Sequence, residues 1–266
     1  MNKKITIPIL QKKKKEGQKI SMLTAYDYTL AKIVDQAGVD VVLVGDSLGM
    51  VIQGRKNTLA VKLEEMIYHS RCVSRALEHA HLVCDMPFMS YHTSLEEAVR
   101  NCGKVLKQGH AEAVKLEGGE EIAPLVKRLT DFGIPVMGHI GLKPMHVHKM
   151  GGYKIQGRNS HGEKQILKDA KLLEKAGAYS IVLEGIPAAL AKKITHSIKI
   201  PTIGIGSGSA CDGQVLVIYD LLGMYQEIKP KFVRQYASLF ETITQATQKY
   251  IQEVQSGKFP GEKESF

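Results

Sequence analysis

Four short apolar runs in this chain end on a carboxylate at a glycine or proline turn. They cover residues 41–46, 82–87, 113–118 and 180–185, and their acids are Asp46, Asp85, Glu117 and Glu184. The runs are continuously apolar and rich in β-branched residues, as expected of parallel strands that are covered on both faces. Because parallel strands end at one edge of a sheet, we expect the four acids to gather there. The repetition predicts an α/β enzyme with its chemistry at that edge.

Helix-like segments alternate with these runs and with further strand-like segments. The expected strands are 20–26, 41–46, 82–87, 113–118, 134–140, 180–185, 200–206 and 214–219. The expected helices are 6–17, 27–37, 63–78, 94–107, 120–131, 162–176 and 231–255. About eight strand–helix units of roughly 30 residues predict a (β/α)8 TIM barrel, with an open doubly wound sheet as the alternative. Since no linker divides the chain, we predict one barrel domain over 1–266, with an N-terminal helix and an additional C-terminal helix.

The composition favours a cytoplasmic enzyme. No apolar stretch approaches the roughly 18 residues of a membrane span, and no apolar segment of a secretory signal follows the N-terminus. The four cysteines are scattered, so we expect them to be reduced and mostly buried. Neither a membrane partner nor a zinc site is indicated.

The chain carries a formal net charge of +9, with a run of four lysines from Lys12 to Lys15. We interpret this run as a solvated helix face. A positive surface favours small anionic substrates. Nucleic-acid binding is the alternative, but the chain has no tryptophan and its basic run has no interleaved aromatic residues.

Asp46, Asp85 and Glu117 close the second, third and fourth expected strands. Neighbouring strands lie about 4.8 Å apart, so these three carboxylates can surround one ion. Oxygen ligands of this kind suit Mg²⁺. The alternative is that each acid caps the loop or helix that follows it.

Glu184 closes the sixth expected strand, away from the other three acids. A single carboxylate that faces a metal across the barrel can act as a general base on a carbon next to a metal-held carbonyl. Lys115 lies two residues before Glu117 and therefore points to the same face of its strand. It is expected to bind a substrate oxygen or one of the carboxylates; Schiff-base chemistry is an alternative that the acids disfavour by keeping the amine protonated.

Weaker candidates lie in the adjoining loops. Ser47 offers a hydroxyl and a backbone N–H to an anion, and His139 is either a hydrogen-bond donor in the site or a structural residue. His146 and His148 are expected in a lid formed by the loop 141–161. The Gly-rich segment 204–208 is similar to the phosphate-binding turn found after the seventh strand of many barrels.

With these residues in view, the chain closely resembles the ketopantoate hydroxymethyltransferase (3-methyl-2-oxobutanoate hydroxymethyltransferase) family. The resemblance extends from about Ile20 to Gly223. The matching blocks are residues 22–27, 44–50, 85–88, 114–119, 138–142, 183–184, 202–208 and 211–217.

The resemblance implies a (β/α)8 barrel, commonly a homodecamer, that transfers a hydroxymethyl group from 5,10-methylenetetrahydrofolate to 3-methyl-2-oxobutanoate. The reaction requires Mg²⁺, proceeds through a stabilised enolate and gives 2-dehydropantoate in pantothenate biosynthesis. The implied metal ligands are Asp46 and Asp85, with Glu117 binding directly or through water, and Glu184 is the implied proton acceptor. Residues expected to contact the oxo acid are Asp46, Ser47, Asp85, Lys115 and His139.

A Mg²⁺-dependent lyase or mutase of the phosphoenolpyruvate mutase and isocitrate lyase type is the alternative. It shares the barrel and the metal-held enolate but does not need folate. The residues that would bind folate are not indicated by any motif.

Overall fold

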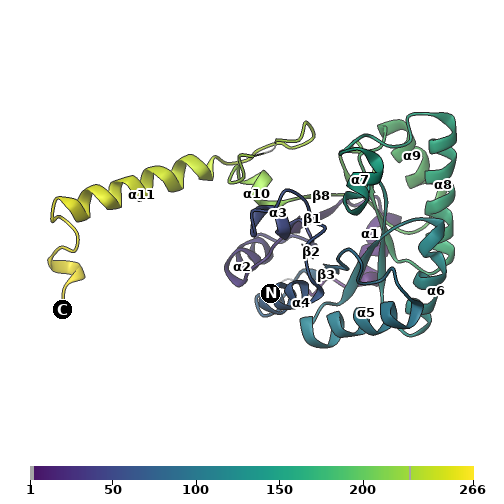
Figure 1. Ribbon diagram of the computed structural model, residues 1–266, viewed down its shortest axis with the longest axis horizontal. Coiled ribbons are helices and arrows are strands. Elements are labelled where there is room, and N and C mark those ends of the chain that lie inside the picture. Colours follow the sequence, from purple (N-terminus) through teal and green to yellow (C-terminus); the bar gives the residue numbers. More distant parts are fainter. Residues whose placement is uncertain (1–2, 228) are drawn as a thin grey trace. The chain divides into compact units, whose positions relative to one another are not determined.

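Eight parallel strands close into a barrel in the computed structural model, which describes residues 3–227 and 229–266 (Figure 1). The strands are β1 (Ile20–Thr24), β2 (Val41–Val44), β3 (His81–Asp85), β4 (Ala113–Glu117), β5 (Val136–Gly141), β6 (Ser180–Glu184), β7 (Thr202–Ile205) and β8 (Gly213–Leu216). Each strand pairs with the next, and β8 pairs with β1. The predicted (β/α)8 barrel is therefore confirmed, and the open sheet is wrong.

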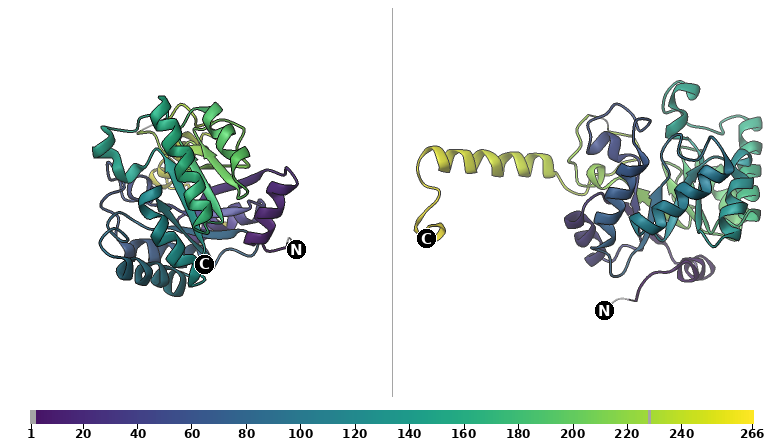
Figure 2. Two further views of the ribbon diagram at one scale, coloured as in Figure 1. Left: turned by 90° about the vertical axis from the view of Figure 1, so that its right-hand side faces the viewer. Right: turned by 60° about the horizontal axis from the view of Figure 1, so that its bottom comes forward.

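Helices cover the outside of the barrel. They are α2 (Tyr28–Gln36), α4 (Leu63–Ser74), α5 (Leu95–Gly109), α6 (Ala123–Asp131), α8 (Ser160–Lys175) and α9 (Ala188–Ser197). Figure 2 shows α8 and α9 side by side on the outside of the sheet. Short helices lie in the loops that follow β2, β4 and β5, namely α3 (Leu48–Val51), η1 (Glu120–Ile122), η2 (Pro144–His146) and α7 (Val147–Met150).

Local sequence signals fix where several of these helices begin. The Asp27 carboxylate accepts a hydrogen bond from Leu30 N at 2.9 Å and caps α2. Ser94 caps α5 by accepting from Glu97 N at 3.1 Å. The Glu97 side chain hydrogen-bonds the Thr93 hydroxyl and not Ser94 N, so only one of the two bonds of a capping box forms at Ser94.

Apolar side chains from the strands fill the barrel. The central cluster includes Met22, Val41, Val83, Met137, Val182, Ile203 and Val215. Burial of each such side chain contributes about 1.5–3 kcal/mol. Ile5 and Leu10 join the same cluster, so α1 (Ile7–Lys15) and the residues before it close the end of the barrel where the strands begin.

The lysine run does not form a uniformly solvated face. Lys13 forms an ion pair with Asp40, and Lys14 Nζ lies 2.8 Å from Asp212 Oδ2. Asp40 precedes β2 and Asp212 precedes β8, so the two lysines attach α1 on both sides of β1. The solvated-face interpretation holds for Lys12 and Lys15 and is wrong for Lys13 and Lys14.

Differences in element boundaries are largest near the C-terminus. β8 ends at Leu216, and residues 218 and 219, which the sequence predicted as strand, belong to α10 (Ile218–Leu221). The last helix, α11 (Leu239–Gln255), begins eight residues after the predicted start at 231. The reason is that 236–240 turn back on α10, with Tyr236 N and Leu239 N donating to Leu221 O and Leu222 O.

The chain forms two compact units, Met1–Val217 and Ile218–Phe266. The first contains the barrel, and the second contains α10, α11 and η3 (Glu262–Glu264). None of the described α11 residues is buried, and the helix exposes apolar side chains: Phe240, Ile243, Tyr250, Ile251 and Val254. One barrel domain over 1–266 stays a prediction.

Two expectations from composition can be compared with the described residues. Within 3–227 and 229–266, no helix has both the length and the apolarity that a membrane crossing requires. The cysteines Cys72, Cys84, Cys102 and Cys211 are free, and all but Cys72 are buried.

Candidate functional site

The four acids occupy the carboxyl ends of their strands. Asp85, Glu117 and Glu184 are the last residues of β3, β4 and β6, and Asp46 follows β2 by two positions. Strand register places Asp85 beside Lys115 and Glu117 beside His139. Asp46, Asp85 and Glu117 are buried and Glu184 is nearly so, and we call this cluster of charged side chains at the end of the barrel the carboxylate pocket.

Asp46 and Asp85 lie together at the ends of adjacent strands. Asp46 N donates to Asp85 Oδ2 at 3.1 Å. A Cβ on Gly45 would lie 2.8 Å from Ser47 Oγ, so glycine at this position lets the chain turn tightly. Ser47 Oγ also lies 2.8 Å from the Tyr26 hydroxyl. The loop after β2 therefore places Asp46 and Ser47 at the pocket.

Burial shifts the protonation of both carboxyl groups. The pKa of Asp46 is raised well above its ordinary value by burial and then by the negative charges of Asp85 and Glu117. Burial also raises the pKa of Asp85, although the Lys115 ammonium lowers it. Asp46 Oδ2 is buried without a hydrogen-bond partner among the described residues. A bound cation would reduce the repulsion between these carboxylates and would give Asp46 Oδ2 a partner.

Lys115 bridges two parts of the pocket. Its Nζ lies 3.0 Å from Asp85 Oδ1 and 3.1 Å from His139 Nδ1. Burial lowers the pKa of this amine, but the charges of Asp85, Glu117 and Asp46 outweigh burial and raise it. The expected contact with a carboxylate is confirmed, and a protonated amine argues against Schiff-base chemistry.

Glu117 has partners at both carboxylate oxygens. Oε2 accepts from Met145 N at 3.1 Å, and Oε1 lies 3.5 Å from His139 Nδ1. Burial opposes ionisation, yet the contacts with His139, then Lys115 and Met145 N, lower the pKa of Glu117. The Tyr91 hydroxyl donates to Glu117 O at 3.0 Å and fixes the strand end.

His139 joins the two sides of the barrel. Its Nε2 lies 3.1 Å from Glu184 Oε2, opposite the Lys115 contact at Nδ1. Burial and the Lys115 charge lower its pKa, but contacts with Glu117 and Glu184 outweigh them and raise it to about 9. The raised pKa favours the imidazolium form of His139, in which both ring nitrogens carry a proton. A hydrogen bond donated by the Lys115 ammonium to His139 Nδ1 instead requires that Nδ1 carry no proton. Nε2 carries a proton in both forms and lies near Glu184 Oε2, but it forms no hydrogen bond among the described residues, so the contact is an ion pair of the imidazolium form.

The donor set determines which metal this pocket fits. Across the described part of the chain, no three His, Cys, Asp or Glu side chains already form a metal-binding group. Asp46 and Asp85 offer two adjacent carboxylates, and among the described residues Asp46 Oδ2 and Asp85 Oδ1 have no hydrogen bond, the latter having only its ion pair with Lys115. Carboxylate oxygens with room for water fit Mg²⁺ and not zinc, which prefers nitrogen and sulfur.

The weaker candidates take other places. His146 ends η2 in the loop after β5, where burial and Lys143 lower its pKa, and His148 is exposed. The Ser207 hydroxyl donates to Leu183 O at 2.7 Å, so it connects the glycine-rich turn to β6. That bond commits the only hydroxyl of residues 204–208, which weakens the phosphate-binding interpretation.

Two contacts in the pocket were not predicted from the sequence. Tyr91 supports Glu117, and Thr58 lowers the pKa of Asp46 from the loop after α3. Neither lies at a strand end or in a recognisable motif. Their roles depend on how the loops fold over the barrel.

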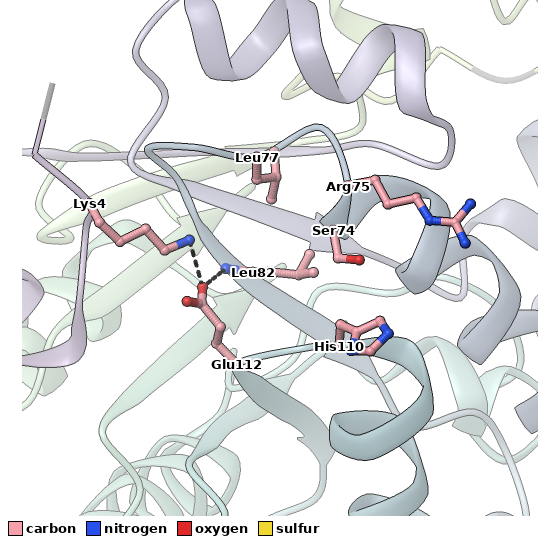
Figure 3. A pocket seen from close by; sticks show the side chains of 7 residues that line it. All are labelled: Lys4, Ser74, Arg75, Leu77, Leu82, His110 and Glu112. Carbon is pink, nitrogen blue, oxygen red and sulfur yellow. Dashed lines mark hydrogen bonds and ion pairs between the residues drawn. The ribbon is translucent and has the colours of Figure 1, made fainter. Parts of the chain in front are cut away.

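A separate pocket of about 330 Å³ lies at the opposite end of the barrel (Figure 3). Its lining includes Lys4, Arg75, His110 and Glu112. Glu112 Oε2 lies 3.0 Å from Lys4 Nζ and accepts from Leu82 N at 2.7 Å. Leu82 is near the start of β3, so this pocket is remote from the four acids.

The sequence of this chain is similar to those of known enzymes of one family. A family model described as ketopantoate hydroxymethyltransferase matches residues 4–262. The chain is 55% identical over 266 residues to the 3-methyl-2-oxobutanoate hydroxymethyltransferase of Pelobacter propionicus, covering 100% of this chain and 98% of that protein. It is 54% identical over 266 residues to the enzyme of the same name from Trichlorobacter lovleyi, covering 100% of both chains.

Solved structures with a similar fold are more distant in sequence. A phosphonopyruvate hydrolase crystallised with oxalate and Mg²⁺ matches with a TM-score of 0.63 and 11% identity, covering 98% of this chain and 93% of that one. A 2,3-dimethylmalate lyase of the PEP mutase/isocitrate lyase superfamily matches with a TM-score of 0.61 and 13% identity, covering 96% and 89%. At such identities these likenesses concern the fold alone.

Proposed function

Because this chain belongs to the ketopantoate hydroxymethyltransferase family, we propose that its carboxylate pocket binds 3-methyl-2-oxobutanoate and a divalent cation for hydroxymethyl transfer. The chain is a hydroxymethyltransferase, the enzyme of pantothenate synthesis that forms 2-dehydropantoate. The one-carbon unit comes from 5,10-methylenetetrahydrofolate in this proposal. The observation that carries the proposal is the cluster of Asp46, Asp85 and Lys115 beside the separate pair of His139 and Glu184.

Asp46 and Asp85 are the proposed Mg²⁺ ligands, with Glu117 contributing directly or through water. The buried, unpartnered Asp46 Oδ2 supports this assignment. When bound there, Mg²⁺ would withdraw electron density from the keto oxygen of a 2-oxo acid and stabilise the negative charge that develops on it. The pocket's oxygen donors match a hard cation of this kind.

The remaining residues hold the substrate and move its proton. The Lys115 ammonium faces the metal side and would pair with the oxo-acid carboxylate, assisted by the Ser47 hydroxyl and backbone N–H. Glu184 would accept the proton from C3 of the oxo acid. His139 Nε2 lies 3.1 Å from Glu184 Oε2 and would orient that carboxylate through this ion pair. The carbon that has lost its proton would then bond to the one-carbon unit of 5,10-methylenetetrahydrofolate. One water would supply the hydroxyl oxygen as the carbon–nitrogen bonds to the folate break, and tetrahydrofolate would leave.

The proposed assembly is a homodecamer, as in the family that the chain resembles. The exposed apolar side chains of α11 support association between copies, because a monomer would leave them in water. Light scattering measures the mass directly, and a monomer at working concentration would contradict the proposal.

Product formation tests the proposed function. We expect 2-dehydropantoate when the protein is mixed with 3-methyl-2-oxobutanoate, methylenetetrahydrofolate and Mg²⁺. EDTA should abolish the product, and added Mg²⁺ should restore it. Turnover that persists unchanged in EDTA would refute the metal assignment.

The rival function is that of a Mg²⁺-dependent oxo-acid lyase or mutase. It has the support of a shared fold with the superfamily that includes 2,3-dimethylmalate lyase. Folate dependence separates the two, since a lyase or mutase would act on its substrate without methylenetetrahydrofolate.

A further inference from the structure

The segment 142–157 lies between β5 and α8 beside the carboxylate pocket, and we call it the mouth arch. Its first residues are fixed at the pocket, where Leu142 N donates to Glu184 O at 2.8 Å and Met145 N donates to Glu117 Oε2 at 3.1 Å. Near its end, Gln156 N donates to Gly185 O at 2.9 Å. The residues between these bonds, including α7, are therefore held at both ends beside Glu117 and Glu184.

The mouth arch is strongly cationic. No Asp or Glu occurs from 142 to 162. Lys143 pairs with Glu121 at 2.9 Å, but Lys149 and Lys154 have no ion pair within 3–227 and 229–266. Both side chains are exposed. Two lysines that remain unpaired beside a catalytic pocket are available to an anionic ligand.

Apolar side chains accompany these lysines. Tyr153 and Ile155 are 47% and 48% exposed, and they flank Lys154 in the sequence. The Tyr153 hydroxyl lies 4.0 Å from Met50 Sδ, so the arch reaches the loop that follows β2. Ile52 in that loop is exposed as well. The pocket opening thus combines an aromatic ring, aliphatic side chains and unpaired positive charge.

We propose that the mouth arch binds the folate co-substrate, with Lys149 and Lys154 pairing with carboxylates of its glutamate tail. This inference rests on the proposed hydroxymethyl transfer. A folate consists of flat aromatic rings followed by glutamate, and each further glutamate adds a carboxylate. Tyr153 and Ile155 offer contact area to the rings, and the lysines complement the tail.

The arch lysines are not needed to neutralise the buried acids. Lys115 and His139 already pair with Asp85, Glu117 and Glu184, and Met145 N satisfies Glu117 Oε2. Neither Lys149 nor Lys154 contacts any of these carboxylates among the described side chains. Their charge is therefore available to an anionic ligand that approaches from solvent.

The number of glutamates in the folate tail provides the test. The KM of the intact enzyme is measured for methylenetetrahydrofolate with one glutamate and with three, at fixed low salt. We expect a lower KM for the triglutamate form. In the variant Lys149→Gln with Lys154→Gln, that KM should rise about fivefold and the monoglutamate KM only about twofold, as expected for loss of exposed ion pairs.

The matched control removes two exposed lysines from α8. Lys171→Gln with Lys175→Gln changes the net charge equally but lies outside the mouth arch, and neither lysine has an ion pair among the described residues. It should preserve the tail-length preference. A wild type that shows no preference, or an arch variant whose two KM values rise equally, overturns the inference. Absence of 2-dehydropantoate with either folate overturns the proposed function itself.

Discussion

At the residue scale, His139 connects the side chains proposed to bind metal and substrate with the proposed base. Lys115 and Glu184 lie on opposite edges of its ring, each at 3.1 Å. His139 is 2% exposed, so bulk solvent does not reach either contact. A shift of this ring would move the Glu184 carboxylate, so His139 acts as a positioning residue as well as a candidate substrate contact.

Substitution of His139 distinguishes positioning from packing. His139→Gln retains a donor where Nε2 lies, whereas His139→Ala leaves Glu184 without one. We expect kcat to fall about 100-fold in the alanine variant and about tenfold in the glutamine variant. The KM for the oxo acid should change less than kcat in both.

Steady-state kinetics at saturating folate measures this difference, with circular dichroism as the control for folding. Equal kcat losses in the two variants would argue that the ring only fills space.

Sequence reasoning reached the residues at strand ends and missed those that depend on loops. The alternation of side chains along β4 placed Lys115 with Glu117, and the acids of adjacent strands accounted for its pairing. Tyr91 and Thr58 approach the pocket from loops whose paths no local pattern indicates. For His139 the sequence left two interpretations open, a donor in the site or a structural residue, because a single histidine in a sequence does not indicate which groups it contacts.

At the element scale, α1 acts as a closing element of the barrel. Lys14 Nζ contacts Asp212 Oδ2, Thr195 O at 3.0 Å and Ile200 O at 2.9 Å, and its side chain is only 13% exposed. The acceptor Asp212 also receives a hydrogen bond from Thr202 N at 2.8 Å. A single lysine thereby joins α1 to the segments around β7 and β8.

Neighbouring lysines of α1 should differ sharply in their contribution to stability. Lys14→Met removes a nearly buried charge from three acceptors and should lower the free energy of unfolding by about 2 kcal/mol. Lys15→Met removes the same charge from an exposed position and should change it by less than about 0.5 kcal/mol. Urea unfolding measures both, and equal midpoints would contradict the assigned role of α1.

The helix and strand pattern was predictable where it is periodic. The strand ends of β3, β4 and β6 coincide with their acids, as the sequence predicted. The C-terminal helix was placed too early because Phe232 and Val233 continue an apolar pattern. In the structure, Tyr236 N and Leu239 N donate hydrogen bonds to Leu221 O and Leu222 O. These bonds hold the segment before 239 out of helical conformation, so α11 begins later.

At the scale of the whole molecule, closure of the barrel gives the four acids the different positions on which their proposed roles rest. Asp46, Asp85 and Glu117 follow consecutive strands, whereas β5 separates Glu117 from Glu184. His139 at the end of β5 bridges that gap. The number of strand–helix units was sufficient to predict the barrel. The contacts of His139 with Glu117 and Glu184 could not be predicted, because they depend on the register between β4, β5 and β6, and no sequence pattern indicates that register.

The central claim is that Glu184 removes the C3 proton while the other acids hold the metal and the substrate. Its most direct test is exchange of that proton of 3-methyl-2-oxobutanoate into deuterated water, followed by NMR with Mg²⁺ present. Glu184→Gln keeps an acceptor for His139 but cannot take a proton, so exchange should fall about 1,000-fold while Mg²⁺ binding is retained. Exchange at the wild-type rate in this variant would contradict the assignment of Glu184 as the base.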